Sequence, residues 1–104
     1  CEVEYVAGFE PVVNDAGWAE RVRDAAAAVA GEEVVAPMRT IMGGEDFSAY
    51  LAQVPGAFFF VGARNEAIDA VYPHHHPRFA IDEDAMRTGI ALFQRVALDY
   101  LAPA

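Results

Sequence analysis

Residues 55–62 read PGAFFFVG, and the fold prediction for this 104-residue chain rests on that stretch. Five consecutive apolar residues between a Pro-Gly pair and a glycine are typical of a strand that is buried on both faces. Because Pro55-Gly56 ends any helix that precedes it, residues 57–61 are predicted to form a strand of their own. The stretch therefore favours a fold that contains a sheet.

Helices are predicted on both sides of this strand. Asn14 is a plausible N-cap for a helix that runs to about Ala30 and ends at Gly31. A shorter helix is predicted from Glu45 to Val54, after a turn at the two preceding glycines, and a final helix from the N-cap Asp82 to about Leu101. The predicted core stripes are Trp18, Val22, Ala25, Ala26 and Val29 in the first helix, and Met86, Gly89, Ile90, Phe93, Val96, Ala97 and Tyr100 in the last.

Two further strands complete the expected order. Residues 2–7 alternate charged and apolar side chains, which is the period of a half-exposed strand, and residues 33–38 are typical of a short buried one. The order strand, helix, strand, helix, strand, loop, helix predicts an α/β fold, with a sheet flanked by helices.

Length and charge restrict the classes of partner. A chain of 104 residues forms one domain at most. Seven basic against 16 acidic residues give a net charge of −9, which disfavours nucleic acid and anionic membrane surfaces as partners. No apolar run approaches the roughly 20 residues of a membrane helix. The single cysteine excludes an internal disulfide and suits a reducing compartment, so we expect a cytoplasmic protein.

All three histidines lie in residues 72–79, which read YPHHHPRF. Two prolines exclude a helix interior or a central strand, so this stretch is a loop that presents imidazole groups. Histidine is the commonest side-chain ligand of transition metals, but neighbouring imidazoles rarely bind one ion. At most one or two of His74, His75 and His76 are therefore metal ligands. The alternative is an exposed polar turn without chemistry.

Residues 42–47, MGGEDF, allow two interpretations as well. Two acidic residues after a glycine turn stabilise the positive end of a helix dipole and need no further role. Alternatively, the glycines allow the backbone to approach a ligand closely, with a carboxylate beside it.

Taken in order, these motifs resemble one family. PVVND (residues 11–15), MGGEDF, PGAFFFVG, HHPRFAIDE (residues 75–83) and the helix around Gly89 are similar to the C-terminal part of the metal-dependent amidohydrolases. That family includes hippurate hydrolases, auxin–amino acid conjugate hydrolases, N-acyl-amino-acid deacylases and related carboxypeptidases. The resemblance covers essentially the whole chain and carries no information on the substrate within the family.

The resemblance implies a zinc-peptidase-like catalytic α/β domain with two divalent metal ions (zinc, manganese, nickel or cobalt) and an inserted lid domain that often mediates dimers. It implies that His75 is a metal ligand, with His76 at a variable position beside it. Glu45 or Asp46 is a candidate hydrogen-bond partner of His75. The candidates for the substrate cleft are Gly43, Gly44, Glu45, Asp46 and His76.

The chain departs from the family pattern in one respect. The Cys-x-His-Asp-x-His-type segment and the paired glutamates are absent, and Cys1 is followed by Glu2-Val3-Glu4. We therefore expect a C-terminal fragment in which residues 1–12 are the last strand of the lid domain and residues 13–104 belong to the catalytic domain. Such a fragment holds one metal ligand and no catalytic residue, so we expect it to bind no metal pair alone and to be inactive.

The complete parent enzyme is then expected to hydrolyse the amide bond of an N-acyl amino acid or a similar conjugate through metal-activated water. A homodimer or other self-association is expected, because a lid strand without its sheet exposes an unpaired edge. Two alternatives remain open. One is a non-enzymatic α/β interaction or structural module with an inert histidine loop, and the other is a split enzyme whose missing half is a separate chain.

Overall fold

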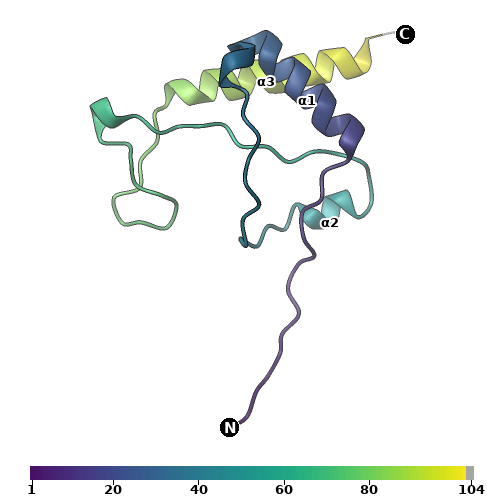
Figure 1. The fold of residues 1–104 in the computed structure, drawn as a ribbon, viewed down its shortest axis with the longest axis vertical. Coiled ribbons are helices and arrows are strands. Elements are labelled where there is room, and N and C mark those ends of the chain that lie inside the picture. Colours follow the sequence, from purple (N-terminus) through teal and green to yellow (C-terminus); the bar gives the residue numbers. More distant parts are fainter. Residues whose placement is uncertain (103–104) are drawn as a thin grey trace.

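The computed structural model describes residues 1–102, and two long helices organise them (Figure 1). Helix α1 covers Ala16–Ala30 and packs against α3, which covers Asp84–Leu101. A single-turn helix, α2, covers Ser48–Leu51, and short 3₁₀ helices η1 and η2 cover Glu32–Val34 and Glu66–Ile68. The remaining described segments are turns, loops and extended chain.

Helix α1 confirms the first predicted helix, with its N-cap one residue later than expected. The Asp15 side chain accepts a hydrogen bond from the Trp18 N–H at 2.9 Å, which satisfies one of the free amides of the first turn. Gly31 ends the helix with a φ of 96°, a conformation that side-chain-bearing residues rarely adopt. Both ends of this helix are therefore set by signals within a few residues.

The α1–α3 contact forms the small apolar core. Ala25 and Leu92 are almost fully buried, and the Trp18 and Tyr100 rings lie 5.4 Å apart. The predicted stripe of α1 is confirmed, since none of its members is exposed. The predicted stripe of α3 is mostly wrong by the same measure, because it omitted the buried Leu92 and most of its members are exposed, namely Met86, Ile90, Phe93, Ala97 and Tyr100. Helix α3 has apolar residues on two faces, and α1 covers only one of them.

The predicted α/β fold is wrong for the part of the chain that is described. Residues 1–102 contain no sheet, and their only β-pairing is an isolated bridge between Asn65 and Ala70. Residues 2–7 are extended and exposed, and the predicted strand at 33–38 begins instead in the 3₁₀ helix η1. Strand-like sequence is not sufficient for a strand, because a strand needs a neighbour that supplies its backbone hydrogen bonds.

Residues 57–61 show how an extended segment is held without such a neighbour. The side chain of Asn14 accepts from the Phe58 N–H at 2.8 Å and donates to the Phe58 carbonyl at 2.9 Å. Beside this pair, the Asp15 N–H donates to the Gly56 carbonyl at 2.9 Å. On the side of α3, the rings of Phe59 and Phe93 lie 5.3 Å apart. A side chain thus supplies the two bonds that a neighbouring strand would make.

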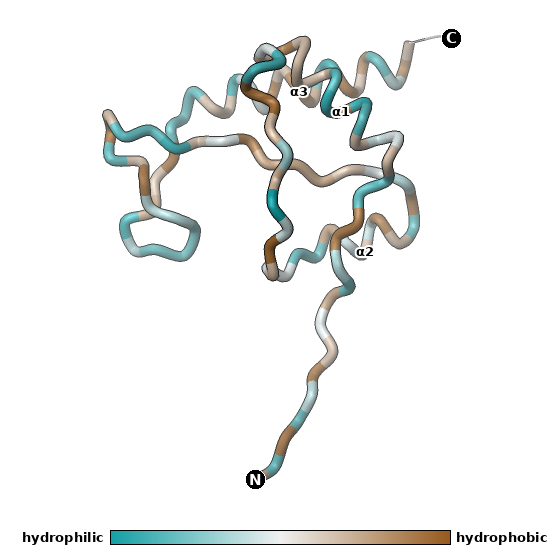
Figure 2. Tube along the Cα trace, in the orientation of Figure 1, coloured by the Kyte–Doolittle hydropathy of each residue, from teal (hydrophilic) through white to brown (hydrophobic). Residues whose placement is uncertain are grey.

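The described chain exposes far more surface than a compact domain of its mass. Its accessible area is 8950 Å², whereas a compact 11.3 kDa protein exposes about 5,700 Å². The radius of gyration of 16.7 Å similarly exceeds the roughly 13 Å of a compact chain of this length. Figure 2 shows apolar residues on the extended segments as well as on the helices. Within residues 1–102, no helix combines the length and apolar character that a membrane crossing requires.

Candidate functional site

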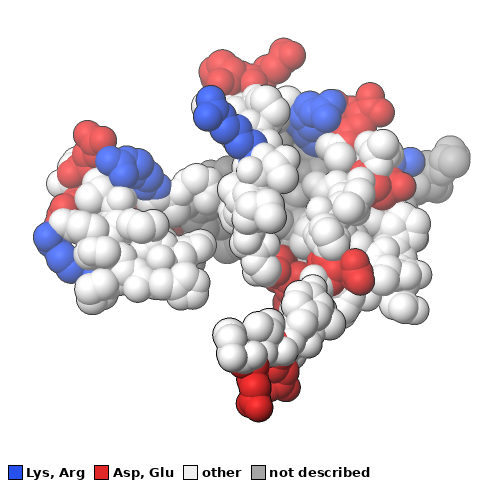
Figure 3. Space-filling model, turned by 60° about the horizontal axis from the view of Figure 1, so that its bottom comes forward, with Lys and Arg blue, Asp and Glu red and all other residues white. Residues whose placement is uncertain are grey.

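The histidine loop, residues 72–79, forms a lobe of its own beside η2. Figures 1 and 3 show this lobe standing apart from the helix pair, with acidic and basic side chains next to each other on it. One such pair joins Arg78 to Asp69, and another joins Arg64 to Glu66 at 3.1 Å. Exposed pairs of this kind contribute little stability singly, so the loop depends on its other contacts.

His76 is held by four contacts inside the loop, one of which is the hydrogen bond that its backbone N–H donates to the Pro73 carbonyl at 3.2 Å. The His76 ring stacks on Tyr72 with 4.4 Å between the ring centroids and 13° between the planes. Its Nδ1 accepts a hydrogen bond from the Arg78 N–H at 3.1 Å, and its carbonyl accepts from the Phe79 N–H at 2.9 Å. A neutral His76 therefore carries its proton on Nε2, because Nδ1 must remain an acceptor. Neither ring nitrogen then has a lone pair free for a metal ion.

The other two histidines differ from His76 and from each other. The His74 ring lies edge-on to Phe79 at 4.9 Å. His75 is exposed and has a φ of 68°, the left-handed conformation that costs a histidine roughly 1 kcal/mol. No hydrogen bond joins its imidazole to any residue of the described chain. The His74 imidazole likewise bonds to no described residue, so the loop presents two imidazoles with unoccupied nitrogens, and of these two residues only His75 has a positive φ.

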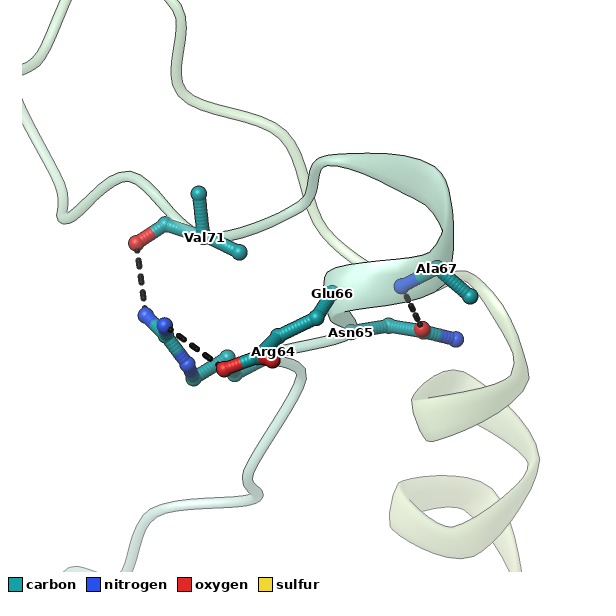
Figure 4. A network of polar contacts seen from close by, with 5 residues as sticks. All are labelled: Arg64, Asn65, Glu66, Ala67 and Val71. Atoms are coloured by element: carbon teal, nitrogen blue, oxygen red, sulfur yellow. Dashed lines mark hydrogen bonds and ion pairs between the residues drawn. The ribbon is translucent and has the colours of Figure 1, made fainter.

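The base of the histidine loop is tied together by polar contacts. The backbone groups of Asn65 and Ala70 exchange two hydrogen bonds of 2.9 Å, and the Arg64 guanidinium donates to the Val71 carbonyl at 2.9 Å (Figure 4). Ala70 is 2 % exposed, so this junction is the one well-covered part of the lobe. Asn65 also begins η2, since its Oδ1 accepts from the Ala67 N–H at 2.9 Å.

The far end of the loop returns to the same base at Asp82. The Asp82 N–H donates to the Ala63 carbonyl at 2.9 Å, and its Oδ2 accepts from Asn65 Nδ2 at 2.7 Å. Its Oδ1 accepts from the Asp84 N–H at 3.0 Å at the start of α3. The bond from Asn65, followed by the bond from the Asp84 amide, lowers the pKa of the Asp82 carboxyl. Asp82 was predicted as a helix N-cap, but the sequence carried no signal for its contact with Asn65.

The glycine segment, residues 42–47, lies away from the loop and is mostly exposed. Gly43 and Gly44 make no turn and have no positive φ, so the predicted turn is wrong. A turn begins instead at Asp46 and leads into α2. Glu45 caps this turn locally, because its Oε1 accepts from the Phe47 N–H at 3.3 Å and its carbonyl accepts from Ser48 Oγ at 3.1 Å.

The structure does not bring the predicted site residues together. Neither Glu45 nor Asp46 makes a hydrogen bond or ion pair with the histidine loop, and no three His, Cys, Asp or Glu side chains of residues 1–102 are arranged to hold a metal ion. A tetrahedral zinc site needs three or four protein ligands. The donor set of the described chain therefore does not fit a complete metal site.

Two shallow hollows elsewhere are not part of this arrangement. One, of about 270 Å³, lies between α1 and α3 and is lined by Trp18, Arg21, Asp24, Arg95, Val96, Asp99 and Tyr100. The other, of about 360 Å³, is lined by Val13, Asn14, Asp15 and residues 51–56. Neither contains a histidine or a predicted cleft residue, so neither identifies the site.

Comparison with known proteins gives a family match across nearly all of these elements. The sequence profile of peptidase family M20/M25/M40 matches residues 1–99. The chain belongs to this family. Its members are metal-dependent hydrolases, in agreement with the resemblance carried by the sequence motifs. A comparison with solved structures found no match.

The names of individual relatives describe different hydrolase activities. The chain is 31 % identical over 101 residues to thermostable carboxypeptidase 2 of Saccharolobus solfataricus, covering 96 % of this chain and 25 % of that protein. It is 34 % identical over 93 residues to IAA-amino acid hydrolase ILR1-like 4 of Arabidopsis thaliana, covering 89 % and 21 %. It is 39 % identical over 86 residues to N-acetyl-L-cysteine deacetylase of Bacillus subtilis, covering 83 % and 19 %. The chain thus spans about a quarter or less of the length of these relatives.

Proposed function

We propose that this chain is the C-terminal part of an M20-family amidohydrolase that cleaves the amide bond of N-acyl amino acids, and that His75 is one of its metal ligands. The names of two relatives, an IAA-amino acid hydrolase and an N-acetyl-L-cysteine deacetylase, support the substrate class. The share of the relatives that the chain spans supports the view that other segments supply the remaining ligands.

The observation that carries the metal assignment is that His75 combines a positive φ with an exposed imidazole that bonds to no described residue; His74 shares the exposed imidazole but has no positive φ. His76 uses Nδ1 to accept the Arg78 N–H and stacks on Tyr72, whereas His75 is exposed with both nitrogens free. His75 also keeps a φ of 68° despite its backbone cost. Such a cost at a projecting imidazole is typical of a residue kept for function.

The roles of the remaining residues follow from their positions. When bound, a divalent ion polarises a carbonyl oxygen and promotes the ionisation of water. This chain contributes the His75 imidazole, whose recorded ring contact is with His74, at 6.5 Å between the ring centroids. Gly43 and Gly44 stay candidates for the cleft wall, since a Cβ at Gly44 would meet no atom within 4 Å and the segment is open to a ligand.

The test is a set of matched asparagine substitutions in the complete enzyme. Asparagine tolerates the left-handed conformation, so His75→Asn preserves the loop shape and removes the strong metal ligand. We expect it to lose about one metal ion per active site and to lower kcat/KM by about 100-fold or more. His74→Asn and His76→Asn serve as controls and are expected to retain the metal.

Metal content is measured by elemental analysis, and kcat/KM on a panel of N-acetyl amino acids and dipeptides. Faster hydrolysis of dipeptides than of N-acyl amino acids would contradict the substrate class. Full metal content in His75→Asn, or equal metal loss in all three variants, would contradict the ligand assignment. A complete protein with no hydrolase activity on either class would favour the non-enzymatic module.

A further inference from the structure

Within the described chain, the histidine loop makes its hydrogen bonds, ion pairs and ring contacts only with residues of its own lobe. The hydrogen bonds, ion pairs and ring contacts of residues 72–79 all involve partners within residues 69–79. The position of the loop relative to α3 is therefore decided at the base, where residues 63–65, 70–71 and 82 meet.

One side-chain hydrogen bond closes this base across the two ends of the loop. Asn65 Nδ2 and Asp82 Oδ2 lie 2.7 Å apart, although the two residues are 17 positions apart in the sequence, and the contact is partly buried. A short bond to a charged acceptor is stronger than one between neutral groups. It also fixes the start of α3, because the same carboxylate accepts from the Asp84 N–H.

The chemistry of this pair is directional. Asn65 donates through Nδ2 and accepts through Oδ1 from the Ala67 N–H, while Asp82 accepts through both oxygens. In Asp82→Asn, the side-chain NH₂ group would replace one of the two acceptor oxygens. This donor would then face another donor, either Asn65 Nδ2 or the Asp84 N–H. A carboxylate at position 65 would face the Asp82 carboxylate at hydrogen-bond distance. Each single exchange therefore breaks a bond, whereas exchanging both residues restores every donor–acceptor match.

We propose that Asn65 and Asp82 are positioning residues that place the histidine loop, and with it the His75 imidazole, relative to α3. This inference rests on the proposed function, in which His75 binds metal. It adds that the geometry of this ligand is set by a pair of side chains that touch neither the imidazole nor the metal.

The test uses the complete enzyme loaded with cobalt(II), whose visible absorption reports the geometry of its ligands. The variants are Asn65→Asp, Asp82→Asn and the double exchange N65D/D82N, with Glu66→Gln as a control in the same lobe that breaks only an exposed ion pair. We expect each single variant to raise the Kd for cobalt by about 10-fold or more and to alter the spectrum. The double exchange should return both to within about 3-fold of the native protein, and the control should leave both unchanged.

The two single variants change the net charge in opposite directions, so a purely electrostatic effect on the metal would give opposite shifts in Kd. Opposite shifts, or native Kd and spectrum in both folded single variants, would overturn the inference. If the single variants do not fold, the double exchange decides, because a folded double variant with an altered spectrum also overturns it. Failure of the proposed function gives a different result, namely an unchanged cobalt spectrum in His75→Asn.

Discussion

The histidine loop and the glycine segment differ in how much of their shape this chain supplies. The loop is held by the stack of Tyr72 on His76 and by a polar junction at its base. The glycine segment has no contact of that kind before Glu45, and Met42 is fully exposed. The conformation of the histidine loop is therefore fixed by contacts within this chain, whereas residues 42–44 of the glycine segment have no such contacts. Changes to the loop should act through its own contacts, and changes to the glycine segment through a ligand or a covering surface.

The largest expected effect is on hydrolytic activity, when the chain that carries the histidine loop and the glycine segment is assayed without the rest of the enzyme. The chain alone should show no hydrolysis of N-acyl amino acids with zinc, manganese, nickel or cobalt added, because a free imidazole does not activate water as a full ligand set does. The loss should be the whole enzymatic enhancement, at least about 10⁶-fold. The measurement is product release after the chain has been purified to homogeneity. Turnover that copurifies with the chain would show that the described residues suffice.

Adding a methyl group at Gly44 should distinguish an effect on substrate contact, measured by kcat/KM, from an effect on the free energy of unfolding. Gly44→Ala has free space for its Cβ and no positive φ, so the free energy of unfolding should change by less than about 0.5 kcal/mol. In the complete enzyme, kcat/KM should nevertheless fall by about 10-fold or more if this backbone lies against the substrate. Gly62→Ala is the matched control, because its Cβ also meets no atom within 4 Å. Equal activity in both variants would remove Gly44 from the cleft.

Removing the Tyr72 ring should loosen the loop while leaving the helix pair intact. Both the His76 ring and the Arg78 guanidinium lie 4.4 Å from the Tyr72 ring centroid. Tyr72→Ala should therefore cost about 1 kcal/mol of loop stability, and Tyr72→Phe much less. The His76 ring protons report this by NMR, since the ring current of Tyr72 shifts them upfield. Unchanged shifts in Tyr72→Ala would show that the stack does not order the loop.

The smallest expected effect is the pH dependence of the loop base. The pKa of Asp82 is lowered in the folded chain, first by the bond from Asn65 and then by the Asp84 amide. Its contribution to stability is therefore present above the unfolded pKa of about 3.9 and is lost as the pH falls through the folded value. Urea unfolding of the native chain and of Asn65→Ala between pH 6 and pH 3 should show stabilities that converge at the acid end. A difference that stays constant would mean that the carboxylate form of Asp82 does not matter to this bond.

The helices were predictable because their signals are local. Gly31 and Asp15 lie within one residue of the ends of α1, and the C-terminal end of α3 at Leu101 was predicted from its apolar period. The sheet was not predictable in this way, since residues 57–61 have the composition of a strand but find a side chain, Asn14, in place of a neighbouring strand. The composition of a segment indicates how strongly it favours burial, but it does not indicate which group will satisfy its backbone hydrogen bonds.

The candidate site shows the same division. The prolines correctly indicated a loop, whereas the metal-ligand role of His75, which rests on the sequence motifs, stays a prediction. The tie between Asn65 and Asp82 could not be predicted, because it joins residues 17 positions apart and follows no periodicity. The role of Glu45 as a cap of its own turn was contained in one of the two interpretations of the glycine segment.

The contact between Asn14 and Phe58 also leaves the two flanks of residues 56–59 with different hydrogen-bonding capacity. The polar groups of Gly56 and Phe58 that face residues 14–15 are occupied, whereas the backbone groups of Ala57 and Phe59 bond to nothing else in residues 1–102. A segment with one occupied flank can accept a single further chain along its backbone. Backbone pairing along residues 56–59 is therefore restricted to one side of the segment.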